Sequence, residues 1–233
     1  MQFFSYLING ISLGSVYALI ALGYTMVYGI AKMLNFAHGD VIMIGSYVVY
    51  FAFGASGLNP VLSIVLSMIV CTILGVVIER LAYRPLREAP SLAVLITAIG
   101  VSYLLQQVAQ LSWSSNPKSF TSVVSGMKPV SLFGGQLTIS AETIVTIVAC
   151  VVIMVVLMWF VNYTPAGHAM LAVSEDRGAA QLMGVNVNGT ISLTFAIGSA
   201  LAAIAGALLC SSYPTLQPTT GAMPGIKAFV AAV

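Results

Sequence analysis

The residues best suited to chemistry lie in one short segment, 34–40, at the mouth of an apolar run. Asn35, His38 and Asp40 supply an amide, an imidazole and a carboxylate there. Asp40 is suited to cap the following helix, because its oxygens accept from unpaired N–H groups and its charge suits the positive end of the helix dipole. The same N–H groups also suit a translocated polar group, as in the broken helices of transporters. Both roles stay open, and Phe36 joins the candidate pathway or gate.

A second polar position lies late in another apolar run, where Gln106 and Gln107 are adjacent. An amide facing lipid is costly, so at least one of the two must face protein or water. Gln106 therefore either forms a hydrogen bond between helices or lines a substrate pathway.

The segment 163–189 differs in composition from its surroundings, because charged and small residues interrupt its apolar ones. Its apolar members include Met170, Leu171, Val173, Leu182 and Met183, and its charged members include Glu175, Asp176 and Arg177. This alternation predicts a short amphipathic helix on the cytoplasmic surface, with Gly184 at its C-terminal cap. Such a helix lies on the membrane surface or inserts into a groove on a partner.

The elements that position these residues must cross a membrane. The 233 residues are 59% hydrophobic and only 6% charged, whereas a soluble domain carries about 25% charged residues. In lipid, only helices or closed barrels pair all the backbone N–H and C=O groups in hydrogen bonds. Long unbroken apolar runs such as 143–160 favour helices. These observations exclude a soluble enzyme.

About 20 apolar residues are needed for a helical span. Five runs have nearly that length: Tyr6–Tyr28, Val61–Ile78, Leu92–Leu111, Thr143–Phe160 and Thr190–Leu209. A sixth run, Val41–Phe53, becomes long enough only if its helix starts within 34–40. We expect an all-α, polytopic transmembrane helix bundle of about six spans plus the cytoplasmic segment, forming a single domain over 1–233.

The apolar stretch 225–233 ends without a cap or polar tail, which suggests a C-terminally truncated chain.

Lysines and arginines in short loops predict the orientation. With six spans, Lys32, Arg80, Arg84, Arg87 and Arg177 fall on one side, and Lys118 and Lys128 on the other. The richer side is expected to be cytoplasmic, which places the N-terminus in the periplasm. The charged loop around Arg80 and Arg87 then either anchors the topology with local ion pairs or contacts a cytoplasmic partner.

Several signatures are missing from the sequence. It has no P-loop, no zinc-protease motif and no paired Cys or His at metal spacing, so we expect neither a cofactor nor a metal. The basic residues form no stripe, which argues against a nucleic-acid partner. Small residues at four-residue spacing, Gly10 with Gly14 and Gly198 with Ala202 and Gly206, predict close helix packing in membrane lipid.

Several segments together resemble one family. They are 9–23, 34–47, 79–87, 97–100, 172–186 and 195–198. The segment 34–40 is the most diagnostic of them. The chain resembles the high-affinity branched-chain amino acid ABC transporter permeases of the LivH type. The resemblance covers nearly the whole chain, although family members continue past the region of 225–233.

The resemblance implies a bacterial inner-membrane importer subunit that performs no covalent chemistry. Its partners would be two ATPase subunits, a second related permease and a periplasmic substrate-binding protein that delivers leucine, isoleucine or valine. The amphipathic segment would then couple to an ATPase through Ala172, Glu175, Asp176, Arg177, Ala179, Met183 and Gly184. Two alternatives remain: an ABC permease for urea or a short-chain amide, and a passive small-solute channel, which would need no docking helix.

Overall fold

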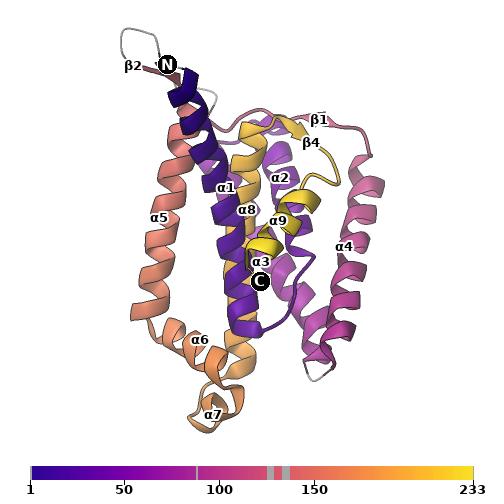
Figure 1. Ribbon diagram of the computed structural model, residues 1–233. Coiled ribbons are helices and arrows are strands. Elements are labelled where there is room, and N and C mark those ends of the chain that lie inside the picture. The colour runs from indigo at the N-terminus through magenta and orange to yellow at the C-terminus, as the bar shows by residue number, and fades with distance from the viewer. Residues whose placement is uncertain (1, 88, 125–128, 133–136, 233) are drawn as a thin grey trace.

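A computed structural model describes residues 2–87, 89–124, 129–132 and 137–232, and most of them are helical (Figure 1). The long helices are α1 (Gln2–Ala31), α3 (Pro60–Ile78), α4 (Ser91–Trp113), α5 (Ala141–Tyr163) and α8 (Val187–Ser212). In the described part of the chain, these five supply all the helices long and apolar enough to cross a membrane. The expected all-α transmembrane bundle is therefore confirmed.

The sixth expected run, 41–53, forms a helix that is not among these five spans. α2 (His38–Val49) continues directly into the π-helical segment η1 (Tyr50–Ala55). The helix thus begins inside the 34–40 window that its length required.

The long helices begin where the sequence offers caps. Asn59 accepts a hydrogen bond from the Val61 N–H, with Pro60 as the first residue of α3. Ser140 caps α5, and Asn186 accepts from the Gly189 N–H at the start of α8. Such side chains pair the N–H groups that the first turn leaves without partners.

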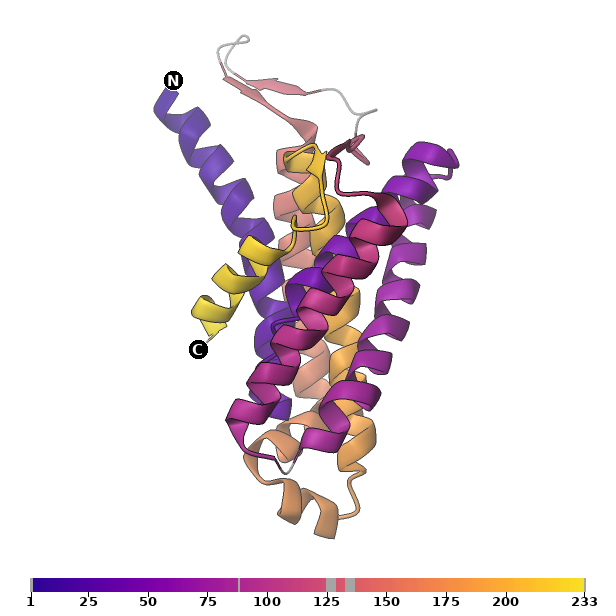
Figure 2. The same ribbon diagram turned by 90° about the vertical axis from the view of Figure 1, so that its right-hand side faces the viewer.

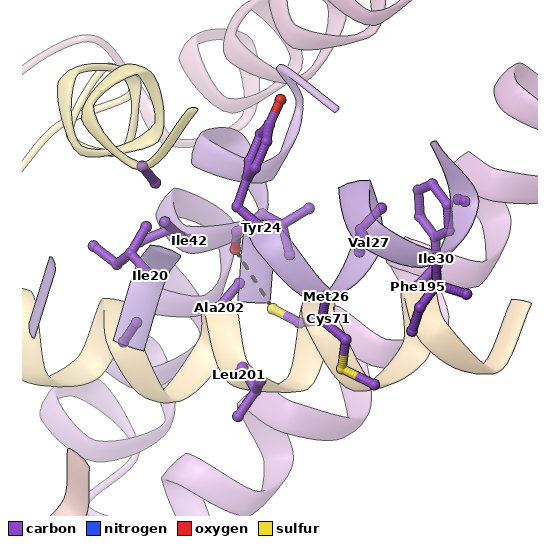
Figure 3. Packing of buried hydrophobic residues seen from close by; sticks show 14 of the residues in the cluster. Ile20, Tyr24, Met26, Val27, Ile30, Ile42, Cys71, Phe195, Leu201 and Ala202 are labelled. Carbon is purple, nitrogen blue, oxygen red and sulfur yellow. Dashed lines mark hydrogen bonds between the residues drawn. The ribbon is translucent and has the colours of Figure 1, made fainter. Parts of the chain in front are cut away.

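α8 lies at the centre of the bundle and packs against α1, α2 and α3 (Figure 1). α5 packs against the outer side of α1, and α4 contacts the bundle through α2 and through the segment 79–83 that follows α3. Between these helices, apolar side chains such as Ile20, Val27, Ile42 and Phe195 form a buried cluster (Figure 3). The Cys71 thiol donates to the Val41 carbonyl within it. The helices that carry the 34–40 segment are therefore fixed by packing.

The small-residue ladder on α8 makes close helix contacts. A Cβ atom added to Gly198 would lie 2.8 Å from the Val27 Cγ2 and 3.1 Å from the Gly23 carbonyl oxygen. The ladder therefore packs closely as expected. Gly10 and Gly14 differ, since a Cβ there would meet nothing within 4 Å.

The connections divide between two ends of the bundle. The N-terminus shares one end with β1 (Lys118–Ser119), β4 (Thr215–Leu216) and the hairpin β2 (Val130–Leu132) with β3 (Leu137–Ile139) (Figure 1). β1 pairs antiparallel with β4, and Lys118 lies opposite Leu216.

The opposite end, called here the α6–α7 end, carries α6 (Pro165–Glu175) and α7 (Arg177–Leu182). It also holds η2 (Glu79–Tyr83) and η3 (Arg84–Leu86), between α3 and α4 (Figure 2). The charged loops thus alternate between the two ends as expected, except that Lys128 lies outside the described residues.

The chain ends in α9 (Ala222–Ala232), a short apolar helix that packs against α1 and α2. The apolar stretch 225–233 is therefore helical over its described residues.

Candidate functional site

The 34–40 segment lies where the chain breaks between two helices. α1 ends at Ala31, and Lys32 has a positive φ of 51° that turns the backbone out of the helix. The chain then doubles back along the bundle before α2 begins at His38 (Figure 1). The start of α2 is therefore inside the protein, and His38 and Asp40 are each only 1% exposed.

Asp40 connects α2 to α4. Its Oδ1 accepts a hydrogen bond of 2.9 Å from the Gln106 Nε2, which also lies 3.3 Å from the Ser102 Oγ. Of the two roles left open for Gln106, bonding between helices is the one observed. Ser102 was not predicted, because a serine in an apolar span gives no signal of its own.

Of the two roles left open for Asp40, capping of α2 is not observed. The N-cap of α2 is Ala37, and no side chain bonds there. Instead, the His38 N–H donates to the Asn35 carbonyl and the Asp40 N–H donates to the Ala37 carbonyl. A tight turn thus provides hydrogen-bond partners for N–H groups at the start of the helix. Asp40 still lies in the first turn, where a negative charge suits the helix dipole.

Asn35 connects the segment to η2. The buried Tyr83 hydroxyl donates to the Asn35 Oδ1 over 2.9 Å. The sequence did not single out Tyr83, since it stands in a charged loop that was interpreted as a topology anchor.

His38 and Phe36 contact α1 and α9. The His38 ring meets Tyr24 edge to face at 5.9 Å, and Phe36 lies 5.0 Å from the Phe229 ring. Gly39 allows this arrangement, because a Cβ there would lie 3.3 Å from the Gly225 Cα at the start of α9.

The segment 34–40 is therefore a hub. Four of its side chains, from Asn35 to Asp40, each contact a different element: η2, α9, α1 and α4. The segment therefore joins four elements from different parts of the sequence.

The second candidate site is the α6–α7 segment, and here the single expected helix is wrong. The chain forms two helices that break at Asp176, whose Oδ1 accepts from the Gly178 and Ala179 N–H groups. A cap bond at this point starts a new helix. Gly184, with a φ of +85°, ends α7 as expected. Its N–H donates to Gln181.

Most of the predicted coupling residues are exposed on this segment. They are Ala172, Glu175, Asp176, Ala179, Met183 and Gly184. Leu182 and Met183 are 90% and 84% exposed, which is unusual for large apolar side chains.

Arg177 differs from the exposed coupling residues. It is partly buried, and its guanidinium donates to the Ala31 carbonyl at the end of α1. Burial, with a smaller contribution from nearby Arg87, lowers the pKa of Arg177 from its usual value. Arg177 therefore ties the segment to α1, next to the chain break that leads to Asp40.

A buried ion pair braces the same end. Glu79 is fully buried, pairs with Arg87 and accepts from the Ser192 Oγ over 2.6 Å. Arg87 also donates to the Asn188 side chain on α8. The expected local ion pair is thus confirmed for Arg87, whereas Glu88 lies outside the described residues.

A family model described as branched-chain amino acid transport system, permease component, matches residues 6–233. The chain belongs to this permease family. It is 44% identical to the permease protein BraD of Pseudomonas aeruginosa, over 97% of this chain and 77% of the relative. It is 41% identical to LivH of Escherichia coli K12, over 100% and 79%, respectively. Both relatives are named high-affinity branched-chain amino acid transport system permease proteins.

The sequence similarity extends to a permease with a different named substrate. A ribose import permease of Haemophilus influenzae is 27% identical over 94% of this chain and 65% of the relative. No solved structure shows a significant match.

Proposed function

We propose that this chain is the membrane permease subunit of an ATP-driven importer of leucine, isoleucine and valine, located in a bacterial inner membrane. The observation that carries the proposal is the match over residues 6–233 to the branched-chain amino acid permease family. Relatives more than 40% identical bear the same function in their names.

The proposed partners are two ATPase subunits, a second related permease and a periplasmic substrate-binding protein. The exposed apolar tip formed by Leu182 and Met183 supports a docked ATPase, because such side chains gain by entering a groove. Movement of the ATPase would reach the bundle through Arg177, which bonds to the end of α1.

The proposed gate consists of Asn35, Phe36, His38, Asp40 and Gln106. An amino acid carries an ammonium group, and Asp40 supplies the opposite charge within the bundle. Because Asp40 is bonded to Gln106, opening of the gate would exchange that bond for one to the substrate.

The orientation follows the distribution of basic residues. With Arg80, Arg84 and Arg177 at the α6–α7 end and Lys118 at the other, the positive-inside rule favours a cytoplasmic α6–α7 end and a periplasmic N-terminus.

Transport in proteoliposomes tests the proposal. The chain is reconstituted with its cognate ATPase, second permease and binding protein, and the uptake of labelled leucine and labelled urea is compared with and without ATP. We expect leucine to accumulate only with ATP. Uptake of urea in its place would reveal a permease for a different solute, and ATP-independent equilibration would reveal a channel; either result overturns the proposal.

A further inference from the structure

An open pocket of about 630 Å³ lies at the α6–α7 end, between η2, η3 and the start of α8. Arg80 and Arg84 line it from one side, and Asn186, Asn188 and Ser192 from the other. Both arginines are exposed, and among the described residues neither forms an ion pair. Glu79 is already bonded to Arg87 and Ser192. The described residues that line the pocket therefore carry a net positive charge.

The start of α8 adds to this charge. Gly189 lines the same pocket in the first turn of a 26-residue helix. The N-terminal turn of a helix favours anions. A phosphate suits paired arginines, since a planar guanidinium bonds two of its oxygens at once.

An apolar groove of about 360 Å³ lies farther along the same two helices. Met68 lines it from α3, Ile197 and Leu201 from α8, and side chains such as Val156 from α5. Its lining is almost entirely apolar, so it suits a hydrocarbon chain.

The two cavities follow one another along α3 and α8. On α3, Met68 of the groove lies about two turns before Val76 of the pocket, and Arg80 follows in η2. On α8, Leu193 of the pocket is followed four residues later by Ile197 of the groove. Residues four apart lie on one helix face. Along α8 the groove therefore begins about one turn beyond Leu193 of the pocket, toward the middle of the membrane.

The length of this path matches one leaflet. From Arg80 to Met68, the helix rises roughly 18 Å at 1.5 Å per residue, and half of the hydrocarbon core is about 15 Å thick. A molecule with an anionic head at the arginines thus has room for a tail in the groove.

We propose that Arg80, Arg84 and the α3–α8 groove form a binding site for one anionic glycerophospholipid. The phosphate lies between the two guanidinium groups, and an acyl chain fills the groove beside Met68 and Ile197. A soluble protein partner would reach the arginines but not the groove, which lies at the depth of the spans. The lipid joins the outer face of α3 to that of α8, where the buried Glu79 network already braces them.

Native mass spectrometry of the purified chain, released from nanodiscs with equal phosphatidylglycerol and phosphatidylcholine of matched chains, tests this site. We expect one retained phosphatidylglycerol adduct on the wild-type chain. The Arg80→Gln and Arg84→Gln double variant should lose it by roughly 10- to 30-fold, because each basic group near a membrane surface contributes about fivefold to anionic lipid binding. Lys32→Gln, an exposed control from the same end, should retain it.

Two further experiments distinguish a site for the whole lipid from a site for its phosphate headgroup alone. Ala200→Phe fills the groove without changing a charge, and should also lose the adduct. Glycerol phosphate, which carries no chain, should not displace the lipid at equal concentration. Retention on Ala200→Phe, displacement by glycerol phosphate, equal binding of phosphatidylcholine, or equal loss in Lys32→Gln would each overturn the proposal. If the double variant does not fold, Ala200→Phe decides alone.

Discussion

Asp40 is a carboxylate almost wholly enclosed by protein within a membrane-embedded bundle, where ionisable groups are costly. One side-chain amide, that of Gln106, bonds to it, and the turn at the start of α2 needs no cap from it. A negative charge in the first turn suits the helix dipole, but this typically contributes only about 0.3–1 kcal/mol. The charge is therefore better explained by the proposed pathway than by stability.

Asp40→Asn tests whether that charge is used. The variant keeps an oxygen that accepts from Gln106 and loses only the charge. We expect leucine uptake to fall at least about tenfold, since a charge-assisted bond to an ammonium contributes roughly 1.5–3 kcal/mol, while the amount of protein in the membrane stays unchanged. Ser102→Ala serves as the control. Full uptake by Asp40→Asn would show that transport does not need the carboxylate.

Residue types and spacing were enough to identify the hub but not its contacts. Asn35, Phe36, His38 and Asp40 were selected because polar groups interrupt an apolar run. Their partners Tyr83 and Phe229 come from distant segments, and only the folded chain brings them together. No local pattern marks such a pair.

At the scale of elements, the apolar runs gave the span boundaries to within a few residues. The expected run 61–78 corresponds to α3, Pro60–Ile78. The break between α6 and α7 was missed, because Asp176 also fits the polar face of a continuous amphipathic helix. Whether an aspartate faces solvent or caps a new turn depends on backbone geometry that the pattern does not contain.

The cap at Asp176 determines how the coupling segment should be mutated. Asp176→Lys removes both the charge and the cap, whereas Asp176→Ser keeps a capping oxygen and loses only the charge. Combined with Glu175→Lys, which changes an exposed side chain, Asp176→Ser should weaken co-purification of the ATPase several-fold and leave the melting temperature unchanged. Asp176→Lys should also lower the melting temperature. Unaltered ATPase binding and transport in all variants would refute the coupling role.

The contact between α1 and α8 depends on Gly198. Gly198→Ala brings a methyl group against Val27 and the Gly23 carbonyl, so we expect a loss of about 1–3 kcal/mol from overpacking. Thermal unfolding in detergent measures it. Gly14→Ala adds the same methyl group where nothing lies within 4 Å, and should be neutral or slightly stabilising. Equal melting temperatures for both variants would contradict the close packing.

At the scale of the whole molecule, the two ends differ in charge and in accessibility. Leu182 is highly exposed at the α6–α7 end, and Lys118 lies in β1 at the other. The native cysteines, Cys71, Cys150 and Cys210, are all buried, so they give little background to a thiol reagent.

Labelling of single added cysteines tests the orientation. In intact cells, a membrane-impermeant maleimide should modify Lys118→Cys, and should reach Leu182→Cys only after the inner membrane is opened. The reverse pattern would place the N-terminus in the cytoplasm. The unmodified chain serves as the background control.

The enclosed position of α2 has a consequence for biosynthesis. Nearly all of its residues are buried, and its main cover, α8, follows only after three further spans. Until then, α2 is a short helix with a carboxylate, and is poorly suited to partition into lipid alone. The centre of this protein is thus completed late, so a ribosome that stalls before Val187 leaves this carboxylate-bearing helix without its main cover, in a form that membrane quality-control proteases can recognise.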